Sequence, residues 1–123
     1  MVVGIVNASG EAVLPLEVQN DSGEREMVEV VVDTGFTGFL TLPWAVVDSL
    51  SLSLLGSAPT TLADGSTAVL DVHEALVVWH GLPRPVECLV TEGAPLLVMA
   101  LLRGSALRIQ VVESGAVEIE ELP

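Results

Sequence analysis

Short apolar runs separated by polar turn signals follow one another along the chain. The runs are rich in Val, Ile, Leu and Thr, and a turn signal recurs about every 8–12 residues, which is typical of an all-β sandwich or barrel. The predicted strands span residues 11–20, 26–32, 39–42, 68–80, 85–90, 106–112 and 116–122. Turn signals at 20–24, 81–83 and 113–115 join them into hairpins. The pattern therefore predicts an all-β chain.

Two segments depart from the strand pattern and predict short helices. Residues 43–50 begin with Pro43, which suits the first turn of a helix. Residues 96–103 are apolar up to the last one and are followed by Gly104. A short strand there is expected to run into one helical turn that the glycine ends. Between these segments, Asp64-Gly65 is a strong hairpin signal within residues 60–67.

The length and composition indicate one domain, spanning residues 1–123, with enough apolar residues for a packed core. Domains cluster near ~100–150 residues, and 50% of the residues are hydrophobic. No apolar run approaches the ~20 residues that a membrane-spanning helix needs. The N-terminal residues lack the basic region and the long apolar region of a signal peptide. We therefore expect a cytoplasmic protein with no membrane partner.

The charge of the chain is strongly acidic. There are 17 Asp and Glu residues against four arginines and no lysine, which gives a net charge of −13. Such a surface repels phosphates, so no nucleic-acid partner is expected. The simple interpretation is that the charge keeps a hydrophobic chain in solution. Cys88 is the only cysteine, which excludes an intramolecular disulfide, and its apolar neighbours predict a small buried side chain.

The histidines and tryptophans are weak candidates for chemistry. His73 and His80 are seven residues apart, and on a strand an odd spacing places two side chains on opposite faces. No second group of ligands accompanies them, so neither a metal nor a cofactor is expected. For Trp44 and Trp79 the default interpretation is core packing, and a wall beside a substrate is the alternative.

One segment, residues 31–43 (VVDTGFTGFLTLP), sets a carboxylate at the end of an apolar run. Asp33 is followed at once by Thr34 and Gly35, then by a second threonine and a second glycine. This segment resembles the active-site segment of aspartic proteases. The chain length and the single copy of the motif make it most similar to the retropepsin-like (retroviral-type) branch, in particular its small bacterial and archaeal members. The hairpins on either side and the late apolar segment follow the order of that family.

The resemblance implies a closed acid-protease β-barrel with one or two short helices and one lobe per chain. It also implies that Asp33, Thr34 and Gly35 are catalytic. In this chemistry two carboxylates about 3 Å apart share a proton and activate a water molecule, which attacks the carbonyl carbon of a peptide bond. The chain has one Asp-Thr-Gly, so we expect a homodimer in which each copy gives one Asp33. Thr34 matches the threonine that hydrogen-bonds across to the other loop, and Gly35 lets the backbone approach that loop.

The resemblance further indicates where a peptide or protein substrate would bind. Residues 60–71, with Asp64 and Gly65 at the tip, match the flap that closes over a bound peptide. An ordinary hairpin turn is the other interpretation. Phe36 and Val98 are expected to be substrate-binding residues on the floor of the site. The terminal hairpin, residues 106–122, is the candidate dimer interface.

Val98 is the main departure from the family pattern. Relatives usually carry a glycine there, and Ala100 stands where many have Asp or Asn. Phe36 replaces the small residue of viral members, but the bacterial branch tolerates it. A β-branched valine restricts the backbone and adds volume behind the active-site loop. Two functions therefore stay open: a homodimeric aspartic endopeptidase, or a catalytically inactive module of the same fold that dimerises or binds peptides by β-augmentation.

Overall fold

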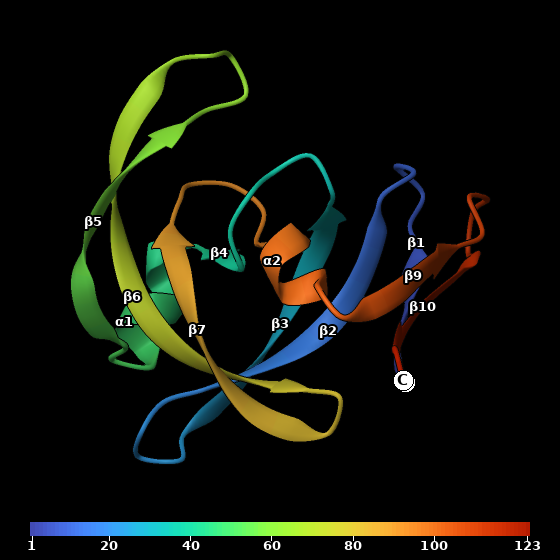
Figure 1. The fold of residues 1–123 in the computed structure, drawn as a ribbon, viewed down its shortest axis with the longest axis horizontal. Coiled ribbons are helices and arrows are strands. Elements are labelled where there is room, and N and C mark those ends of the chain that lie inside the picture. The colour runs from blue at the N-terminus through green and yellow to red at the C-terminus, as the bar shows by residue number, and fades with distance from the viewer.

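The computed structural model describes residues 1–123 as ten strands and two short helices (Figure 1). The strands are β1 (Val2–Val6), β2 (Ala12–Gln19), β3 (Arg25–Asp33), β4 (Leu40–Leu42), β5 (Ser53–Thr61), β6 (Thr67–Trp79), β7 (Leu82–Val90), β8 (Leu96–Val98), β9 (Ser105–Ile109) and β10 (Ala116–Glu121). The helices are α1 (Trp44–Ser49) and α2 (Met99–Leu102).

Six of the strands close into a barrel. They follow one another as β2, β6, β7, β4, β8 and β3, and the pairing of β2 with β6 completes the ring. Successive side chains of a strand point to opposite faces, so alternate residues fill the interior. On β2 these are Leu14, Leu16 and Val18, and on β6 they include Ala75 and Val77, all almost completely buried. The prediction of a closed all-β barrel is confirmed.

Two short strands, β4 and β8, lie side by side in the wall of this barrel. β4 runs parallel to β7 and antiparallel to β8, while β8 runs parallel to β3. The buried hydroxyl of Thr41 accepts a hydrogen bond of 2.9 Å from the backbone N–H of Leu96, which joins β4 to β8. Helix α1 follows Pro43, and α2 follows β8 and precedes Gly104, whose φ is 85°. Both predicted helices are therefore confirmed.

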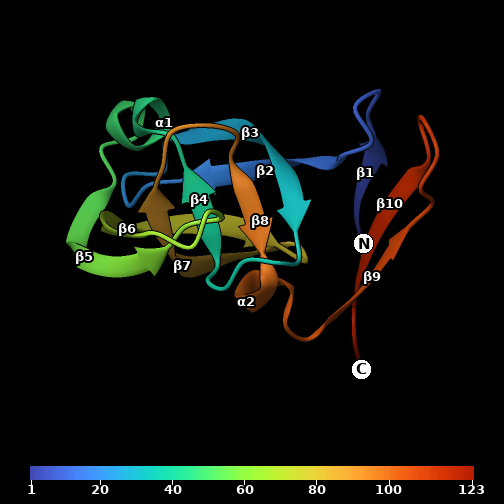
Figure 2. The ribbon, with the colours of Figure 1, turned by 90° about the horizontal axis from the view of Figure 1, so that it is seen from above.

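Strands β1, β10 and β9 form an extension at one side of the barrel (Figures 1 and 2). β1 pairs with β2 of the barrel and with β10, and β9 is the free edge. The sequence pattern missed β1, because Gly4 interrupts its apolar alternation. The structure explains this glycine: a Cβ at position 4 would lie 2.1 Å from the carbonyl oxygen of Val13.

Two predictions about single segments are wrong. β9 ends at Ile109 and not at residue 112, because the chain turns back through backbone hydrogen bonds between Val112 and Gln110 and between Gly115 and Val112. Trp44 is not a core residue: 52% of its surface is exposed, because helix α1 directs its valines into the core instead.

Other predictions about burial hold. Trp79 and Cys88 are buried in the core, as the sequence predicts. Neither helix is long and apolar enough to cross a membrane.

Candidate active site

Asp33 is the last residue of β3, and the loop that leads to β4 follows it immediately. Val28 and Val30 are buried in the core, so β3 is held in the barrel wall up to its end. The Asp33 side chain is half-buried, and its Oδ1 accepts a hydrogen bond of 2.9 Å from the backbone N–H of Gly35. This local bond holds the carboxylate over its own turn, as Asp side chains do in tight turns.

A cleft of about 800 Å³ lies between this loop and the projecting hairpin, which we define as residues 57–71 at the outer ends of β5 and β6. The hairpin stands away from the barrel at the upper left of Figure 1. Asp33 and residues 35–38 line one side of the cleft, and residues 58–63 of the hairpin line the other. Leu89 of β7 completes the lining. The structure thus brings the predicted carboxylate and the predicted flap to one site.

The other predicted site residues are distributed around this cleft. Gly35 and Phe36 line it, as Asp33 does. Thr34 lies instead against a second depression of about 590 Å³, which is also lined by Met99 and Leu107. The loop containing the Asp-Thr-Gly motif therefore separates two concave surfaces, one facing the hairpin and one facing α2 and β9.

Asp64 and Gly65 are exposed at the tip of the projecting hairpin and do not line the cleft in this conformation. Gly65 has a φ of 86°, in the left-handed region that favours glycine. The carboxylate of Asp64 accepts hydrogen bonds from the hydroxyl and the backbone N–H of Ser66. These two bonds lower the pKa of Asp64 below the 3.8 of a free aspartate.

Val98 lies behind the loop and not on the surface of the cleft. Its side chain has no exposed surface, and it pairs in register with Asp33 across β3 and β8. The backbone N–H of Val98 donates a hydrogen bond of 3.2 Å to the carbonyl of Phe39, and the next turn is tied by the N–H of Ala100 to the carbonyl of Gly38 at 2.8 Å. Val98 is therefore packed where it supports the backbone on both sides of the loop.

Comparison with known proteins supports the architecture. No family model matches the sequence, and no curated protein matches it either. Among solved structures, a retropepsin-like aspartic protease from Rickettsia conorii is similar, with a TM-score of 0.59. The similarity covers 98% of this chain and 89% of that chain, at 17% sequence identity. The chain has a retropepsin-like fold.

The structure brings two groups to the cleft that the sequence did not indicate: Leu89 of β7, and Ala58 with Pro59 just before the predicted flap. Leu89 lies in a predicted strand, but nothing in its local pattern shows which face the cleft occupies. Ala58 and Pro59 precede residues 60–71, and a small residue followed by a proline does not show the apolar alternation of a half-buried strand. Their place in the lining becomes visible only once β5 is paired with β6, where Ala58 lies opposite Leu70.

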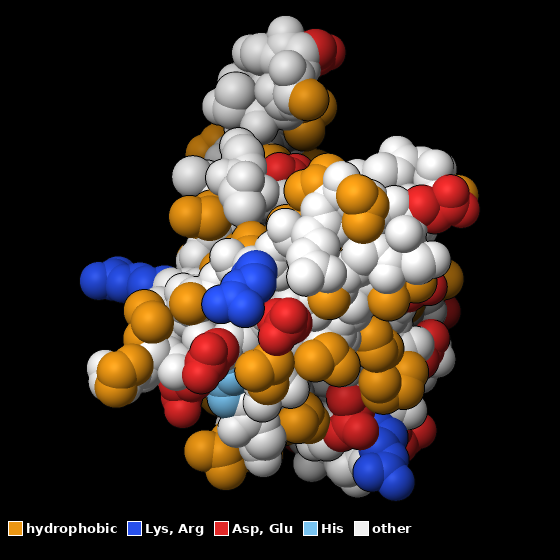
Figure 3. Space-filling model, turned by 90° about the vertical axis from the view of Figure 1, so that its right-hand side faces the viewer, with side chains coloured by type: hydrophobic (Ala, Val, Ile, Leu, Met, Phe, Trp, Pro, Cys, Tyr) orange, Lys and Arg blue, Asp and Glu red, His pale blue; other side chains and the backbone are white.

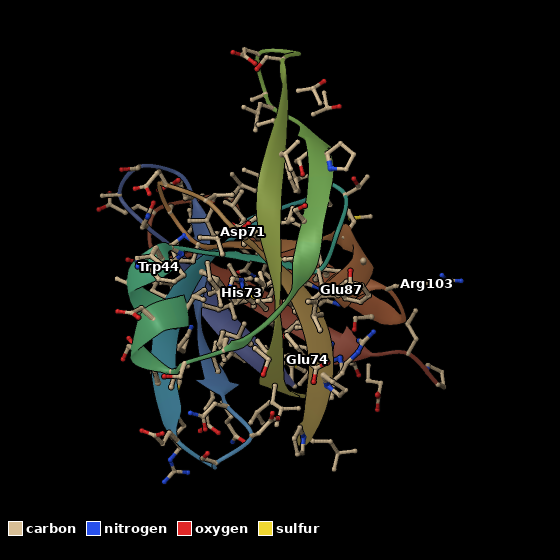
Figure 4. All side chains as sticks on the ribbon, turned by 90° about the vertical axis from the view of Figure 1, so that its left-hand side faces the viewer. Trp44, Asp71, His73, Glu74, Glu87 and Arg103 are labelled. Atoms are coloured by element: carbon tan, nitrogen blue, oxygen red, sulfur yellow. The ribbon has the colours of Figure 1, made fainter.

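Neither histidine lines the cleft. His73 is buried on β6, and its ring meets Trp44 edge-on, with 6.3 Å between the ring centroids (Figure 4). His80 lies in the turn between β6 and β7 and hydrogen-bonds to the hydroxyl of Ser105 at 2.8 Å. The residues of the chain form no group of three His, Cys, Asp or Glu that could hold a metal ion.

Proposed function

We propose that the chain is an aspartic endopeptidase that acts as a homodimer on peptide or protein substrates. One observation carries this proposal: Asp33 and the projecting hairpin line the same cleft of about 800 Å³. This volume lies within the ~300–1,000 Å³ that is typical of ligand clefts. A hairpin over a cleft also gives it a movable cover that excludes water when a substrate is bound. The retropepsin-like fold supports the proposal at the level of architecture.

The proposed reaction needs two carboxylates. The ionised one takes a proton from a water, and the protonated one polarises the scissile carbonyl. The water oxygen bonds to the carbonyl carbon, the C–N bond breaks, and the leaving amine takes up a proton. Asp33 is the only acid that lines the cleft. We therefore infer that the second carboxylate is the partner subunit's Asp33, brought close across a two-fold axis.

Two features beside Asp33 suit contact with a second copy. The depression next to Thr34 contains Met99, which is half exposed, and Leu107 of β9. β9 is also a free sheet edge. Just after β9, the N–H of Gln110 donates a hydrogen bond to the carbonyl of Ala116 at the start of β10. The backbone N–H and C=O groups of the even-numbered residues therefore face β10, and those of residues 105, 107 and 109 point outward. Such an edge is available to pair with a second β9.

The alternative function is a catalytically inactive module that dimerises or binds peptides. The burial of Val98 in register with Asp33 favours it, because a valine there fixes the volume behind the loop. The free edge of β9 would serve either function.

A cleavage assay with the Asp33→Asn variant separates the two functions. Wild type and variant are incubated with a mixed peptide library between about pH 4 and pH 7, the range in which a shared-proton carboxylate pair acts. We expect cuts by the wild type that disappear in the variant, because an amide neither takes a proton from water nor shares one. The same variant should still bind peptides, since Asn has nearly the same shape as Asp.

The oligomeric state of each sample is measured alongside by sedimentation. A well-folded dimer that makes no cuts contradicts the peptidase and supports the inactive module. Cuts that persist in Asp33→Asn contradict the role of Asp33. If the sample is monomeric, the protein or salt concentration is raised until the chain dimerises, and the cleavage assay is then repeated on the dimer, which holds the complete site.

A further inference from the structure

The charged side chains that line the cleft or lie on the projecting hairpin are all acidic. Asp33 is the only charged residue in the lining of the cleft, and its other lining residues are apolar, small or hydroxylated. The projecting hairpin carries two charged residues, Asp64 at the tip and Asp71 at its foot (Figure 4), and both are acidic. Figure 3 shows an acidic side chain near the end of the hairpin and no basic one on it. A substrate in the cleft would therefore meet negative charges alone.

The four arginines all lie elsewhere. Arg25 begins β3, roughly 26 Å along an extended strand from Asp33 at its other end. Arg84 and Arg103 line a separate depression beside His80. Arg103 also lines the depression next to Thr34, on the other side of the loop from the cleft, and in Figure 4 its side chain extends into solvent. Arg108 is on β9, in the extension. None of them lines the cleft, so no basic side chain in its lining offsets the net charge of −13.

We propose that the substrates are peptide segments whose uncharged residues occupy the cleft and whose flanking residues are Lys or Arg. This inference rests on the proposed peptidase function and adds the chemical class of its substrate. A cleft lined by one sign of charge focuses the field of the whole molecule and raises the local concentration of oppositely charged ligands. The otherwise uncharged lining, by contrast, gives a charged side chain inside the cleft no charged partner other than Asp33. These two conditions together favour a substrate with uncharged residues in the cleft and basic residues on either side of it.

Asp64 is the residue best placed to attract a Lys or Arg that flanks the bound part of a substrate. It directly follows residues 62–63, which line the cleft, and it is fully accessible at the hairpin tip. Its hydrogen bonds from Ser66 keep it ionised as the pH falls towards the range in which a carboxylate pair acts. Asp64 therefore keeps its charge to a lower pH than an aspartate without these hydrogen bonds.

The test uses three peptides with one shared apolar core and flanks of Lys, Ser or Glu. We expect kcat/KM for the Lys-flanked peptide to exceed that for the Glu-flanked peptide at least about tenfold at low salt. The ratio should shrink towards one between about 0.01 M and about 1 M salt, because the Debye length falls from about 30 Å to about 3 Å. Binding of the same peptides to Asp33→Asn is measured in parallel by fluorescence anisotropy.

A matched pair of variants separates the local charge from the net charge. Asp64→Asn and Asp21→Asn each remove one exposed carboxylate from a turn, but Asp21 lies in the turn between β2 and β3, away from the cleft. We expect Asp64→Asn to lower the Lys-to-Glu ratio by about two- to threefold and Asp21→Asn to leave it nearly unchanged.

Each outcome of the experiment distinguishes the substrate class from the peptidase function. Equal cleavage of the three peptides overturns the substrate class and leaves the peptidase standing. Binding of the Lys-flanked peptide alone, without cleavage of any, overturns the peptidase and keeps the charge selection. If none of the peptides is cleaved and binding does not distinguish them, both proposals fail.

Discussion

Val98 lies directly beside Asp33, and the two residues form the last pair in the parallel pairing of β3 with β8. The carboxylate therefore stands at the end of one strand while a completely buried valine ends the next. From Val98 the chain enters α2, and hydrogen bonds return from this point to Phe39 and Gly38 on the far side of the Asp33 loop. The position of Asp33 thus depends on packing that Val98 provides.

Truncation of Val98 is expected to destabilise the fold. Val98→Ala removes two methyl groups from a fully buried position, so the free energy of unfolding should fall by about 2 kcal/mol. Denaturant unfolding measures this change. The control is Val3→Ala on β1, where the valine is 58% exposed and the change should stay within about 0.5 kcal/mol. Equal effects at the two positions would contradict the supporting role of Val98.

Substitution of Gly35 is expected to affect function and not folding. A Cβ at this position would meet only Oδ1 of Asp33, at 3.4 Å, so nothing else within the chain requires glycine there. In a dimer with the two Asp33 loops in contact, the added methyl group would separate them, and a displacement of about 1 Å can cost ~100-fold in rate. We therefore expect Gly35→Ala to unfold like the wild type and to lose about that much of kcat/KM.

Gly4→Ala is the matched control for this substitution. Its Cβ would lie 2.1 Å from the carbonyl oxygen of Val13, so overpacking should cost about 1–3 kcal/mol of stability. If Gly35→Ala were the less stable of the two variants, the argument that its glycine serves the contact between copies would be wrong.

The fold was predictable from the sequence where the information is local. Alternating residues such as Leu14, Leu16 and Val18 identify strands, and Asp64-Gly65 identifies a hairpin, because side-chain alternation and turn geometry act over a few residues. The closure of the barrel through Val18 and Val77 was not predictable in the same way. It pairs segments far apart in the chain, and no local pattern encodes that register.

The candidate site was predictable in part for the same reason. Asp33 could be identified from its own segment, since the motif is contiguous. Leu89 and the direction of Val98 could not, because an apolar residue in a strand does not reveal which side of a barrel will carry the cleft. In a three-residue strand such as β8, at the centre of the wall, both sides are covered, and Val98 proved to be buried.

Cys88 is expected to be inert in the folded protein. Burial raises the pKa of its thiol to about 11, from 9.0 for a free thiol, so the reactive thiolate is rare near neutral pH. A thiol reagent at about pH 8 should therefore react slowly with the native chain and rapidly in denaturant. Reaction of the native protein at the rate of the unfolded chain would contradict the burial of Cys88.

The same shift of the Cys88 pKa has a consequence for stability. Because the folded state holds the proton up to a higher pH, its contribution to stability is complete below about pH 9 and is lost as the pH rises towards about 11. A Cys88→Ala variant lacks this titration. Its unfolding free energy should fall less steeply than that of the wild type across the same interval, as measured by denaturant unfolding at each pH.

Association of two copies is expected to depend on pH and salt. Each copy carries a net charge of −13, and like charges oppose close approach. From about pH 8 to pH 5 the carboxylates begin to take up protons, so the repulsion falls and the dimer should tighten. Added salt should act in the same direction, because the Debye length shrinks from about 10 Å at 0.1 M to about 3 Å at 1 M. Sedimentation at both pH values measures the change, and equal or weaker association in acid would contradict it.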